Sequence, residues 1–366
     1  MENRPLHRRR RALVDRTTAT LPSVRREPRV ATYDRRPSQP TISSLRPGAE
    51  KRGQVITLPP LPSLPPLPSL IHAHVILNPA AGGGAAARAL DPIVREFTRQ
   101  GWAVQLERTE GPGHGTELAA RAARAGVERV VAIGGDGTVH DVANGLLRHG
   151  GDVQLGVVPI GTGNDFAKLV GVYRHSPERA VRRLVTARVV AFDVGRALGE
   201  YFVNSIGFGF GPEVVRVRNA MPWLSGFLSY LVPVVRAFAG FRPPRFEVRA
   251  PGFAETGYMM MVEVCNGTTA GGSYKFAPGA DPGDGRLDVC LVRRVSLPRF
   301  LVAVPRVMRG THTGMREVTL FQAREVTIRS LEAPLLLHLD GELRAPGVHE
   351  CAVRVEPARL KVMVAR

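Results

Sequence analysis

The chain has 366 residues, 44% of them hydrophobic and 22% charged, so it can bury a core and has room for two domains. Three scattered cysteines without a Cys-x-x-Cys pair argue against a disulfide scaffold and a zinc site, and favour a reducing, cytoplasmic compartment. No stretch of about 18 uncharged apolar residues is present, which predicts no transmembrane helix.

The net charge of +18 suits an anionic partner such as nucleotide phosphates or acidic lipid headgroups. An arginine-rich composition that reflects a GC-rich genome explains the charge of the body of the chain equally well. Aromatic residues make up only 6%, and no stacking platform for bases is visible, so we expect no nucleic-acid partner.

Residues 1–70 are predicted to form a disordered leader that is first arginine-rich and then proline-rich. Half of the net charge lies in residues 1–53, and the repeat LPPLPSLPPLPSL at 58–70 can only form extended, polyproline-like chain. A solvated tail is the simpler interpretation of the leader, and an arm that touches anionic lipid is the functional one.

The next part, residues 71–190, is predicted to be a doubly wound α/β domain. Apolar strands, glycine-rich turns and helical patterns follow one another in series, which is typical of a parallel sheet flanked by helices. The predicted units are a strand and turn at 73–84, a helix at 87–100, a strand at 102–109, a helix at 115–127, and strand–turn–helix units at 129–150 and 153–171.

Residues 191–366 show a different pattern, because short alternating segments separated by turn residues replace the helical ones. This pattern predicts an antiparallel sandwich or barrel, with the last strand returning to the first domain. The predicted strands are 189–197, 200–209, 245–250, 258–267, 287–293, 316–330, 335–342 and 351–365.

One apolar segment, MPWLSGFLSYLVPVVRAFAGF at 221–241, interrupts the strands. Pro233 and Arg236 break it, so it is unsuited to spanning a bilayer. A helix packed on the domain core is the simpler interpretation, and a lipid-facing flap beside an active cleft is the functional one.

The segment GGDGT at 134–138 carries the strongest chemical signal, because it follows an apolar strand and precedes a helix. Glycines let the backbone approach a phosphate, and a helix N-terminus adds positive potential. The carboxylate of Asp136 suits Mg²⁺ or a bound water, and Thr138 offers a hydroxyl. A tight structural turn is the alternative interpretation.

Two further turns repeat this theme. NPAAGGG at 78–84 follows the first strand, and PIGTGNDFA at 159–167 follows the fourth. Asn78 can contact the adenosine or simply cap its turn, and Asn164 or Asp165 can be an N-cap. Because the carboxyl ends of parallel strands share one edge, the three turns are expected to converge where α/β sheets bind ligands.

Taken in this order, NPAAGGG, GGDGTVHDVANGL and PIGTGNDFA resemble the catalytic domain of the diacylglycerol kinase and sphingosine kinase superfamily. FDVG at 192–195, FVNSIGFG at 202–209, GDGRLDVCLV at 283–292 and HLDGE at 338–342 extend the resemblance through residue 366. It implies an NAD kinase-like α/β nucleotide-binding domain and a β-sandwich domain that flank an ATP cleft.

The resemblance also implies roles for single residues. ATP would be bound by Asn78, Thr109, Gly134, Gly135, Asp136, Gly137, Thr138, Val139, His140, Thr162, Asn164 and Asp165. Glu342 would accept the proton of the attacking hydroxyl, with Asp193 as a second essential carboxylate. A loop with Asp281, Asp284 and Arg286 would hold Mg²⁺, with Asp284 giving a carboxylate and the other two their carbonyls.

Each of these assignments has a plainer alternative. Asp340-Gly341 favours a type I′ hairpin turn, which alone explains the HLDGE segment. The acidic loop at 281–288 is equally consistent with a solvated turn.

These features predict an ATP-dependent kinase that phosphorylates diacylglycerol to phosphatidic acid, in the cytoplasm and in peripheral contact with a membrane. Another lipid alcohol, such as sphingosine, ceramide or a glycolipid, is the first alternative. A soluble-substrate kinase of the NAD kinase type and a catalytically silent nucleotide-binding regulator follow. The sequence leaves open whether the protein is a homodimer.

Overall fold

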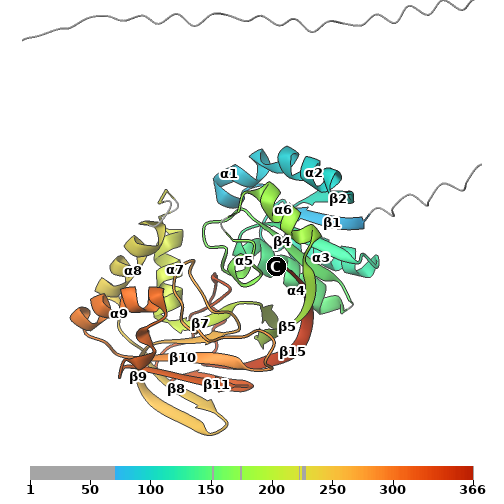
Figure 1. Cartoon of the computed structure of the whole chain (residues 1–366). Coiled ribbons are helices and arrows are strands. Elements are labelled where there is room, and N and C mark those ends of the chain that lie inside the picture. The colour runs from blue at the N-terminus through green and yellow to red at the C-terminus, as the bar shows by residue number, and fades with distance from the viewer. Residues whose placement is uncertain (1–70, 151, 174, 222, 225–227, 366) are drawn as a thin grey trace, which may run out of the picture. The chain divides into compact units, whose positions relative to one another are not determined.

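The computed structural model describes residues 71–366, except residues 151, 174, 222, 225–227 and 366 (Figure 1). The predicted leader at residues 1–70 lies outside the described residues. The described chain contains an α/β domain followed by a sheet-rich domain.

The α/β domain is a parallel sheet flanked by helices. Its strands are β1 (Ile71–Leu77), β2 (Trp102–Arg108), β3 (Arg129–Gly134) and β4 (Gln154–Pro159). Its helices are α1 (Ala81–Arg88), α2 (Leu90–Arg99), α3 (His114–Arg124), α4 (Asp136–His149), α5 (Asp165–Leu169) and α6 (Pro177–Val185). The helix α3 packs against α4, and α2 packs against α6 (Figure 1).

The strand order β2-β1-β3-β4 makes β1 and β3 neighbours, although β2 separates them in the sequence. A ligand-binding crevice forms where the strand order reverses in this way, at the carboxyl ends of the strands. The glycine-rich turns after β1 and β3 therefore lie at the edge of the sheet where a ligand is expected to bind.

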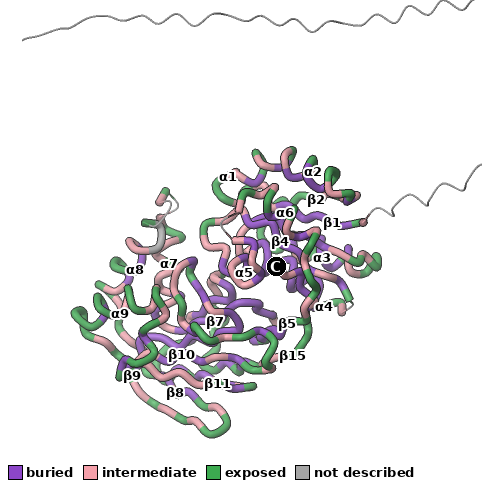
Figure 2. Tube along the Cα trace, viewed as in Figure 1, coloured by how far each residue is buried: buried purple, intermediate pink, exposed green. Residues whose placement is uncertain are grey.

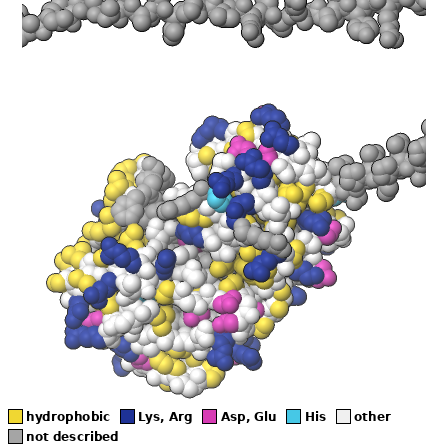
Figure 3. All heavy atoms as spheres, in the orientation of Figure 1, with side chains coloured by type: hydrophobic (Ala, Val, Ile, Leu, Met, Phe, Trp, Pro, Cys, Tyr) yellow, Lys and Arg dark blue, Asp and Glu magenta, His cyan; other side chains and the backbone are white. Residues whose placement is uncertain are grey.

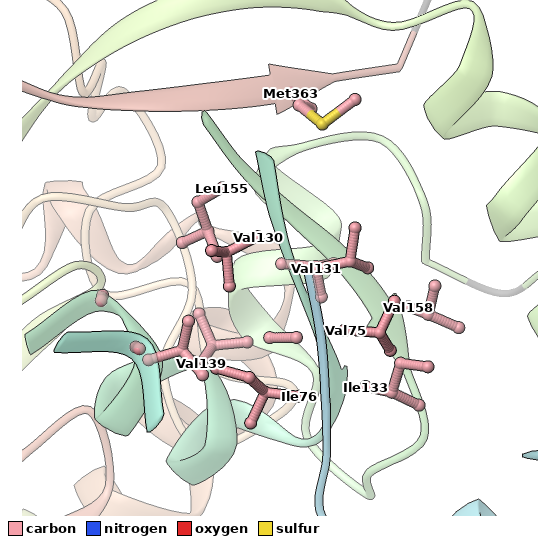
Figure 4. Close-up of a cluster of buried hydrophobic side chains, with 14 of the residues drawn as sticks. Val75, Ile76, Val130, Val131, Ile133, Val139, Leu155, Val158 and Met363 are labelled. Carbon is pink, nitrogen blue, oxygen red and sulfur yellow. The ribbon is translucent and has the colours of Figure 1, made fainter. Parts of the chain in front are cut away.

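The core of the α/β domain is made by nearly continuous apolar strands, as expected for a sheet covered on both faces. Ile76, Val131, Ile133 and Val158 are completely or almost completely buried in it (Figure 4). Met363 joins this cluster from the far end of the chain (Figure 4).

The second domain is a β-sandwich. Its strands are β5 (Arg188–Ala197), β6 (Glu200–Phe202), β7 (Ser205–Gly209), β8 (Arg245–Ala250), β9 (Phe253–Cys265), β10 (Leu287–Arg293), β11 (Val318–Ala323), β12 (Glu325–Ser330), β13 (Leu337–Leu339), β14 (Glu342–Arg344) and β15 (Glu350–Val364). The long strand β9 pairs with β8 through its first half and with β7 and β10 through its second half, so it joins the two layers. Side chains buried between the layers form a separate core. The buried stretches of the sandwich strands are coloured purple along the trace in Figure 2.

Three helices cover one side of the sandwich: α7 (Phe210–Asn219), α8 (Leu228–Gly240) and α9 (Leu297–Arg309), with a short 3₁₀ turn at His312–Gly314. Aromatic contacts hold the helices together, because Phe210 meets Phe238, Phe241 and Phe300 edge to face. Phe238 stacks on Phe300 with ring centroids 4.0 Å apart. No helix of the described residues is long and apolar enough to cross a membrane.

The last strand, β15, belongs to both domains. It pairs antiparallel with β12 and β5 and then parallel with β4. Its register with β5 shifts between Glu356 and Leu360, where Ala358 has a φ of 51°. One continuous strand thus ties the sandwich to the edge of the parallel sheet.

The predicted fold class, an α/β domain followed by a β-sandwich, is confirmed. The sequence pattern did not predict α7 and α9, which lie between strands of the sandwich. For α9 a start signal was present, because Ser296 precedes the helix and Pro298 lies in its first turn. The predicted strand at 200–209 is divided into β6 and β7.

Candidate active site

Three glycine-rich turns lie at the carboxyl ends of β1, β3 and β4 and contact one another. The Ile160 N–H donates to the Gly134 carbonyl over 2.8 Å, and the Asn78 N–H donates to the Ile133 carbonyl over 3.0 Å. The Asn78 Nδ2 also donates to Thr138 Oγ1 over 3.1 Å. The turns therefore form one continuous edge made largely of backbone.

Glycine is required where the turns after β3 and β4 approach each other. A Cβ on Gly161 would lie 2.5 Å from the Gly135 Cα, and a Cβ on Gly134 would overlap the side chain of Thr138. Larger residues would push the turns apart. The bare backbone at the N-terminus of α4 is suited to approach by phosphate oxygens.

The carboxylate of Glu342 lies directly above this turn. A Cβ on Gly137 would come within 2.6 Å of Glu342 Oε1. Gly137 belongs to the first turn of α4, whereas Glu342 begins β14 of the sandwich. The fold thus brings the predicted proton acceptor to the predicted phosphate-binding turn.

A two-residue hairpin between β13 and β14 presents Glu342. Asp340 and Gly341 have φ values of 49° and 88°, as a type I′ turn requires. The buried Asp340 carboxylate accepts the backbone N–H groups of residues 203–205 over 2.8–3.1 Å. The hairpin that the sequence suggested is thus also the support of the candidate base.

His140 fixes this hairpin to α4. Its Nδ1 donates to Asp340 Oδ2 over 2.9 Å, and its Nε2 lies 3.6 Å from Glu200 Oε2. Burial opposes the positive charge, but the hydrogen bonds with the two carboxylates outweigh burial and raise the pKa of His140 to about 9. The hydrogen bond from His140, together with Arg344, lowers the pKa of Glu200 to about 2. His140 is therefore a buried cation at neutral pH.

Asn144 makes a second link between α4 and the sandwich. Its Oδ1 accepts the Tyr201 N–H over 2.9 Å, and its Nδ2 donates to the Tyr201 carbonyl over 2.9 Å. Sequence reasoning did not single out Asn144 or Glu200, and it assigned Asp340 only to a hairpin turn. For Asn144 a signal existed, because it lies one helical turn after His140 and thus on the same helix face.

A cavity of about 530 Å³ opens beside the hairpin, within the usual size range of small-molecule pockets. Its polar end is lined by Asp136, Gly137, Thr162, Asp165, Asp340 and Glu342. The rest is largely apolar, and its lining includes Phe210, Val214, Met221, Val234, Phe300 and Val304 from α7, α8, α9 and the segment before α8. One cavity therefore joins a polar reaction end to a space suited to hydrocarbon.

Two carboxylates from different turns face the polar end. Asp136 Oδ1 accepts the Phe166 N–H over 3.1 Å, and Asp165 pairs with Lys168 over 2.6 Å. Burial, and after it the charge of Asp165, raise the pKa of Asp136 to about 7. A bound cation would relieve this repulsion, so Asp136 fits Mg²⁺ carried by a nucleotide. Both Asp165 oxygens are already engaged, one by Lys168 and the other by the Gly272 N–H over 2.7 Å.

The remaining residues predicted to contact ATP lie farther from the cavity or have structural partners of their own. Thr109 follows β2 and lies outside the cavity lining. Val139 is buried in the core of the α/β domain, and His140 points to Asp340. Asn164 adopts a φ of 51° and donates to the Gly161 carbonyl over 2.6 Å, so it shapes its turn.

Asp193, the predicted second carboxylate, does not join Glu342 in the cavity lining. It is buried, and its two oxygens accept the N–H groups of Gly285 (2.6 Å) and Ala358 (2.7 Å). Its own N–H donates to the Pro282 carbonyl over 2.6 Å. Asp193 therefore anchors the acidic loop and the bend of β15.

The acidic loop itself is exposed and ordered by its own side chains. Asp284 accepts the Arg286 N–H and the Gln322 amide, both over 2.9 Å. Burial and the charge of Asp284 raise the pKa of Asp288. No three His, Cys, Asp or Glu side chains of the described residues group to hold a metal, so Mg²⁺ here would need the backbone carbonyls of Asp281 and Arg286 beside Asp284.

Comparison with known proteins agrees with this architecture. Residues 72–197 match the diacylglycerol kinase catalytic domain, and residues 204–364 match the YegS C-terminal NAD kinase beta sandwich-like domain. A diacylglycerol kinase of Bacillus subtilis is 29% identical over 271 residues, which cover 74% of this chain and 89% of the relative. A Pseudomonas aeruginosa protein named "Probable lipid kinase YegS-like" is 30% identical over 272 residues, covering 73% and 86%.

A crystal structure of a diacylglycerol kinase from Bacillus anthracis shares the fold. It superposes with a TM-score of 0.61 at 20% identity, over 81% of this chain and 97% of that one. The fold and the site thus define a two-domain kinase. The chain belongs to the diacylglycerol kinase catalytic domain family, as the sequence motifs predicted.

Proposed function

We propose that this kinase transfers the γ-phosphoryl group of ATP to the hydroxyl of a membrane lipid, with diacylglycerol as the first candidate and phosphatidic acid as its product. One observation carries the proposal: the Glu342 carboxylate lies over the glycine-rich turn at the polar end of a cavity whose remaining lining is largely apolar. Other lipid alcohols present the same hydroxyl on an apolar body and are the alternative substrates.

The nucleotide is proposed to bind along the glycine-rich edge. The turns after β3 and β4 would surround its phosphates with backbone N–H groups, and Asn78 and Thr162 would add polar contacts. Mg²⁺, when bound, would neutralise charge on the phosphate oxygens, and Asp136 is the carboxylate that fits it, with Asp165 beside it. In this proposal His140 and Val139 do not contact the nucleotide but hold the glycine-rich turn in position.

Glu342 is the proposed general base. A lipid hydroxyl is a weak nucleophile, so its proton must be accepted while its oxygen bonds to the γ-phosphorus and the bond to ADP breaks. The proton passes to the Glu342 carboxylate. His140 and Asp340 are proposed positioning residues, since they hold the hairpin that carries Glu342.

The acidic loop is proposed to hold a structural Mg²⁺. Asp284 would supply a carboxylate oxygen, and Asp281 and Arg286 would supply backbone carbonyls. Asp193 is proposed to stabilise this loop rather than to act in the chemistry, because both of its oxygens are engaged by backbone N–H groups.

The protein is proposed to be cytoplasmic and to touch the membrane through the α8 and α9 region. The apolar segment at 221–241 contains both buried and exposed side chains: Val234 is buried, whereas Trp223 is 74% exposed. On α9, Leu301 is 58% exposed and Arg309 ends the helix. Figure 3 shows this apolar surface beside Lys and Arg side chains. Such a surface suits an anionic bilayer.

The test is a phosphorylation assay with the full-length protein, labelled ATP, Mg²⁺ and mixed micelles of diacylglycerol, sphingosine, ceramide or a glycolipid. NAD serves as the soluble control. Phosphate is expected on a lipid and should be lost in Glu342→Ala, while the exposed control Glu332→Gln keeps its activity. Transfer to NAD alone would refute the lipid substrate, and full activity of Glu342→Ala would refute the assigned base.

A further inference from the structure

Two polar side chains, Glu263 and His338, form a row across the floor of the cavity. In the sheet β13-β7-β9, His338 pairs with Gly207, and Gly207 pairs with Glu263. The three residues therefore lie side by side on one face of three adjacent strands. This is the cavity face, because Glu263 and His338 both line the cavity whereas their neighbours in the strands are core residues.

Gly207 makes this arrangement possible. A Cβ at Gly207 would overlap both Glu263 Oε2 and His338 Nε2, so the two side chains lean toward each other over the bare glycine. Glu263 Oε1 and His338 Nε2 are 3.4 Å apart. Gly211, at the start of α7, also leaves this space open, since a Cβ there would meet His338 Nε2 at 3.2 Å.

The pair is buried but incompletely satisfied. Glu263 is 0% exposed and His338 is 5% exposed. Within the described part of the chain, neither Glu263 oxygen nor His338 Nδ1 has a hydrogen-bond partner. Burying a carboxylate without hydrogen bonds is costly, and few such groups occur in native proteins without a functional reason.

The position of the pair connects it with the substrate. The cavity face runs from Asp340, in the turn after β13 and beside the candidate base, back to His338 on β13. On β9 it runs from Glu263 to Met261, which begins the apolar part of the lining. A lipid with its hydroxyl at Glu342 and its hydrocarbon between α7 and α9 would place its headgroup backbone over Glu263 and His338.

We propose that Glu263 and His338 bind a second polar group of the lipid alcohol and select substrates in which that group is a hydrogen-bond donor, a hydroxyl or an amine. This inference rests on the proposed lipid kinase function. A carboxylate accepts but does not donate, so Glu263 requires a donor from the ligand. The groups beside the hydroxyl of diacylglycerol are ester oxygens, which donate no hydrogen bond, so diacylglycerol would not gain this contact, whereas an alternative lipid alcohol with a second hydroxyl or amine would.

The test compares two acceptors that differ only in the second hydroxyl: a 1-monoacylglycerol and the monoester of 1,3-propanediol with the same acyl chain. The full-length wild type is expected to show a kcat/KM about 10- to 100-fold higher for the monoacylglycerol, as a hydrogen bond to a charged group implies. In Glu263→Leu this ratio should fall to about one, with the KM for ATP unchanged.

Two further variants distinguish a role of Glu263 in substrate selection from a role in folding. Met261→Leu, on the same strand and the same cavity, should leave the ratio between the two lipids unchanged. If Glu263→Leu does not fold, Glu263→Gln is isosteric and should still lower the ratio.

A ratio near one in the wild type, or an unchanged ratio in a folded Glu263 variant, overturns the inference. Transfer to none of the lipids, diacylglycerol included, overturns the proposed lipid substrate and this inference with it. Transfer to diacylglycerol and both monoesters at equal efficiency leaves the lipid kinase standing and overturns only the selection by Glu263.

Discussion

The two walls of the cleft are built from different parts of the polypeptide. On the α/β side the wall is largely backbone: three glycine-rich turns follow three neighbouring strands, and the turns after β3 and β4 meet backbone to backbone at Gly135 and Gly161. On the sandwich side the wall is made of side chains, Glu342, Asp340, His338 and Glu263, which come from β9, β14 and the β13–β14 hairpin.

This difference separates two tasks. Phosphate groups are alike in every nucleotide, so a fixed set of backbone N–H groups suits them and leaves a contiguous motif in the sequence. An acceptor alcohol must be positioned, deprotonated and distinguished from others, which needs side chains whose relative placement the sheet register sets. Specificity is therefore expected to reside in the sandwich wall.

The largest effect is expected where the two walls meet. In Gly137→Ala the new methyl group would lie 2.6 Å from Glu342 Oε1, which is too close, so it would displace the proposed base from the glycine-rich turn. We expect kcat to fall about 100- to 1,000-fold. Steady-state kinetics with the preferred lipid measures the loss, and Gly257→Ala, which has open space around its Cβ, is the control. An unchanged kcat in Gly137→Ala would contradict the assigned position of the base.

The next effect concerns the buried cation between the walls. The folded-state pKa of His140, about 9, lies above its ordinary value of 6.5, so its stabilisation is complete below about pH 6.5 and is lost as the pH rises through 9. The loss is at most about 3 kcal/mol in the free energy of unfolding. Urea unfolding from pH 6 to 9.5 should show this decline in the wild type. A decline of the same size in His140→Gln would disprove the assignment.

A smaller effect should distinguish anchoring from catalysis at Asp193. Asp193→Asn weakens the hydrogen bonds to Gly285 and Ala358, and we expect a loss of about 2 kcal/mol in the free energy of unfolding. At a temperature where the variant is folded, its kcat should remain within about threefold of the wild type, as for the exposed control Asp91→Asn. Loss of kcat at unchanged stability would instead make Asp193 catalytic.

The smallest effect is expected at the outer surface of the sandwich-side helices. Leu301→Asp places a negative charge on the apolar face of α9 and should weaken binding to anionic vesicles about tenfold. Vesicle cosedimentation measures the affinity, and activity on a short-chain, water-soluble acceptor should not change. Leu331→Asp, at another exposed leucine, is the matched control. Equal losses in both variants would argue against α9 as the membrane-facing surface.

Much of the fold was readable from the sequence, because periodic patterns report local structure. The α/β domain follows from apolar strands and glycine-rich turns, and the sandwich follows from alternating segments. The helices α7 and α9 were missed because they lie among strands, and their apolar faces meet only through long-range contacts such as Phe210 with Phe300.

The candidate site likewise has a part that the sequence predicted and a part that only the structure revealed. The sequence by itself identified the glycine-rich turn at 134–138 and the carboxylate of the HLDGE hairpin as candidates, since short contiguous motifs encode backbone geometry. Only the tertiary structure showed that Asp193 lies outside the cavity lining. It also showed the hydrogen bond between His140 and Asp340. The strand register then places Glu263 beside His338 over Gly207. Those contacts depend on strand register and on the packing of two domains, and side chains far apart in a chain carry no local signal of where they will meet.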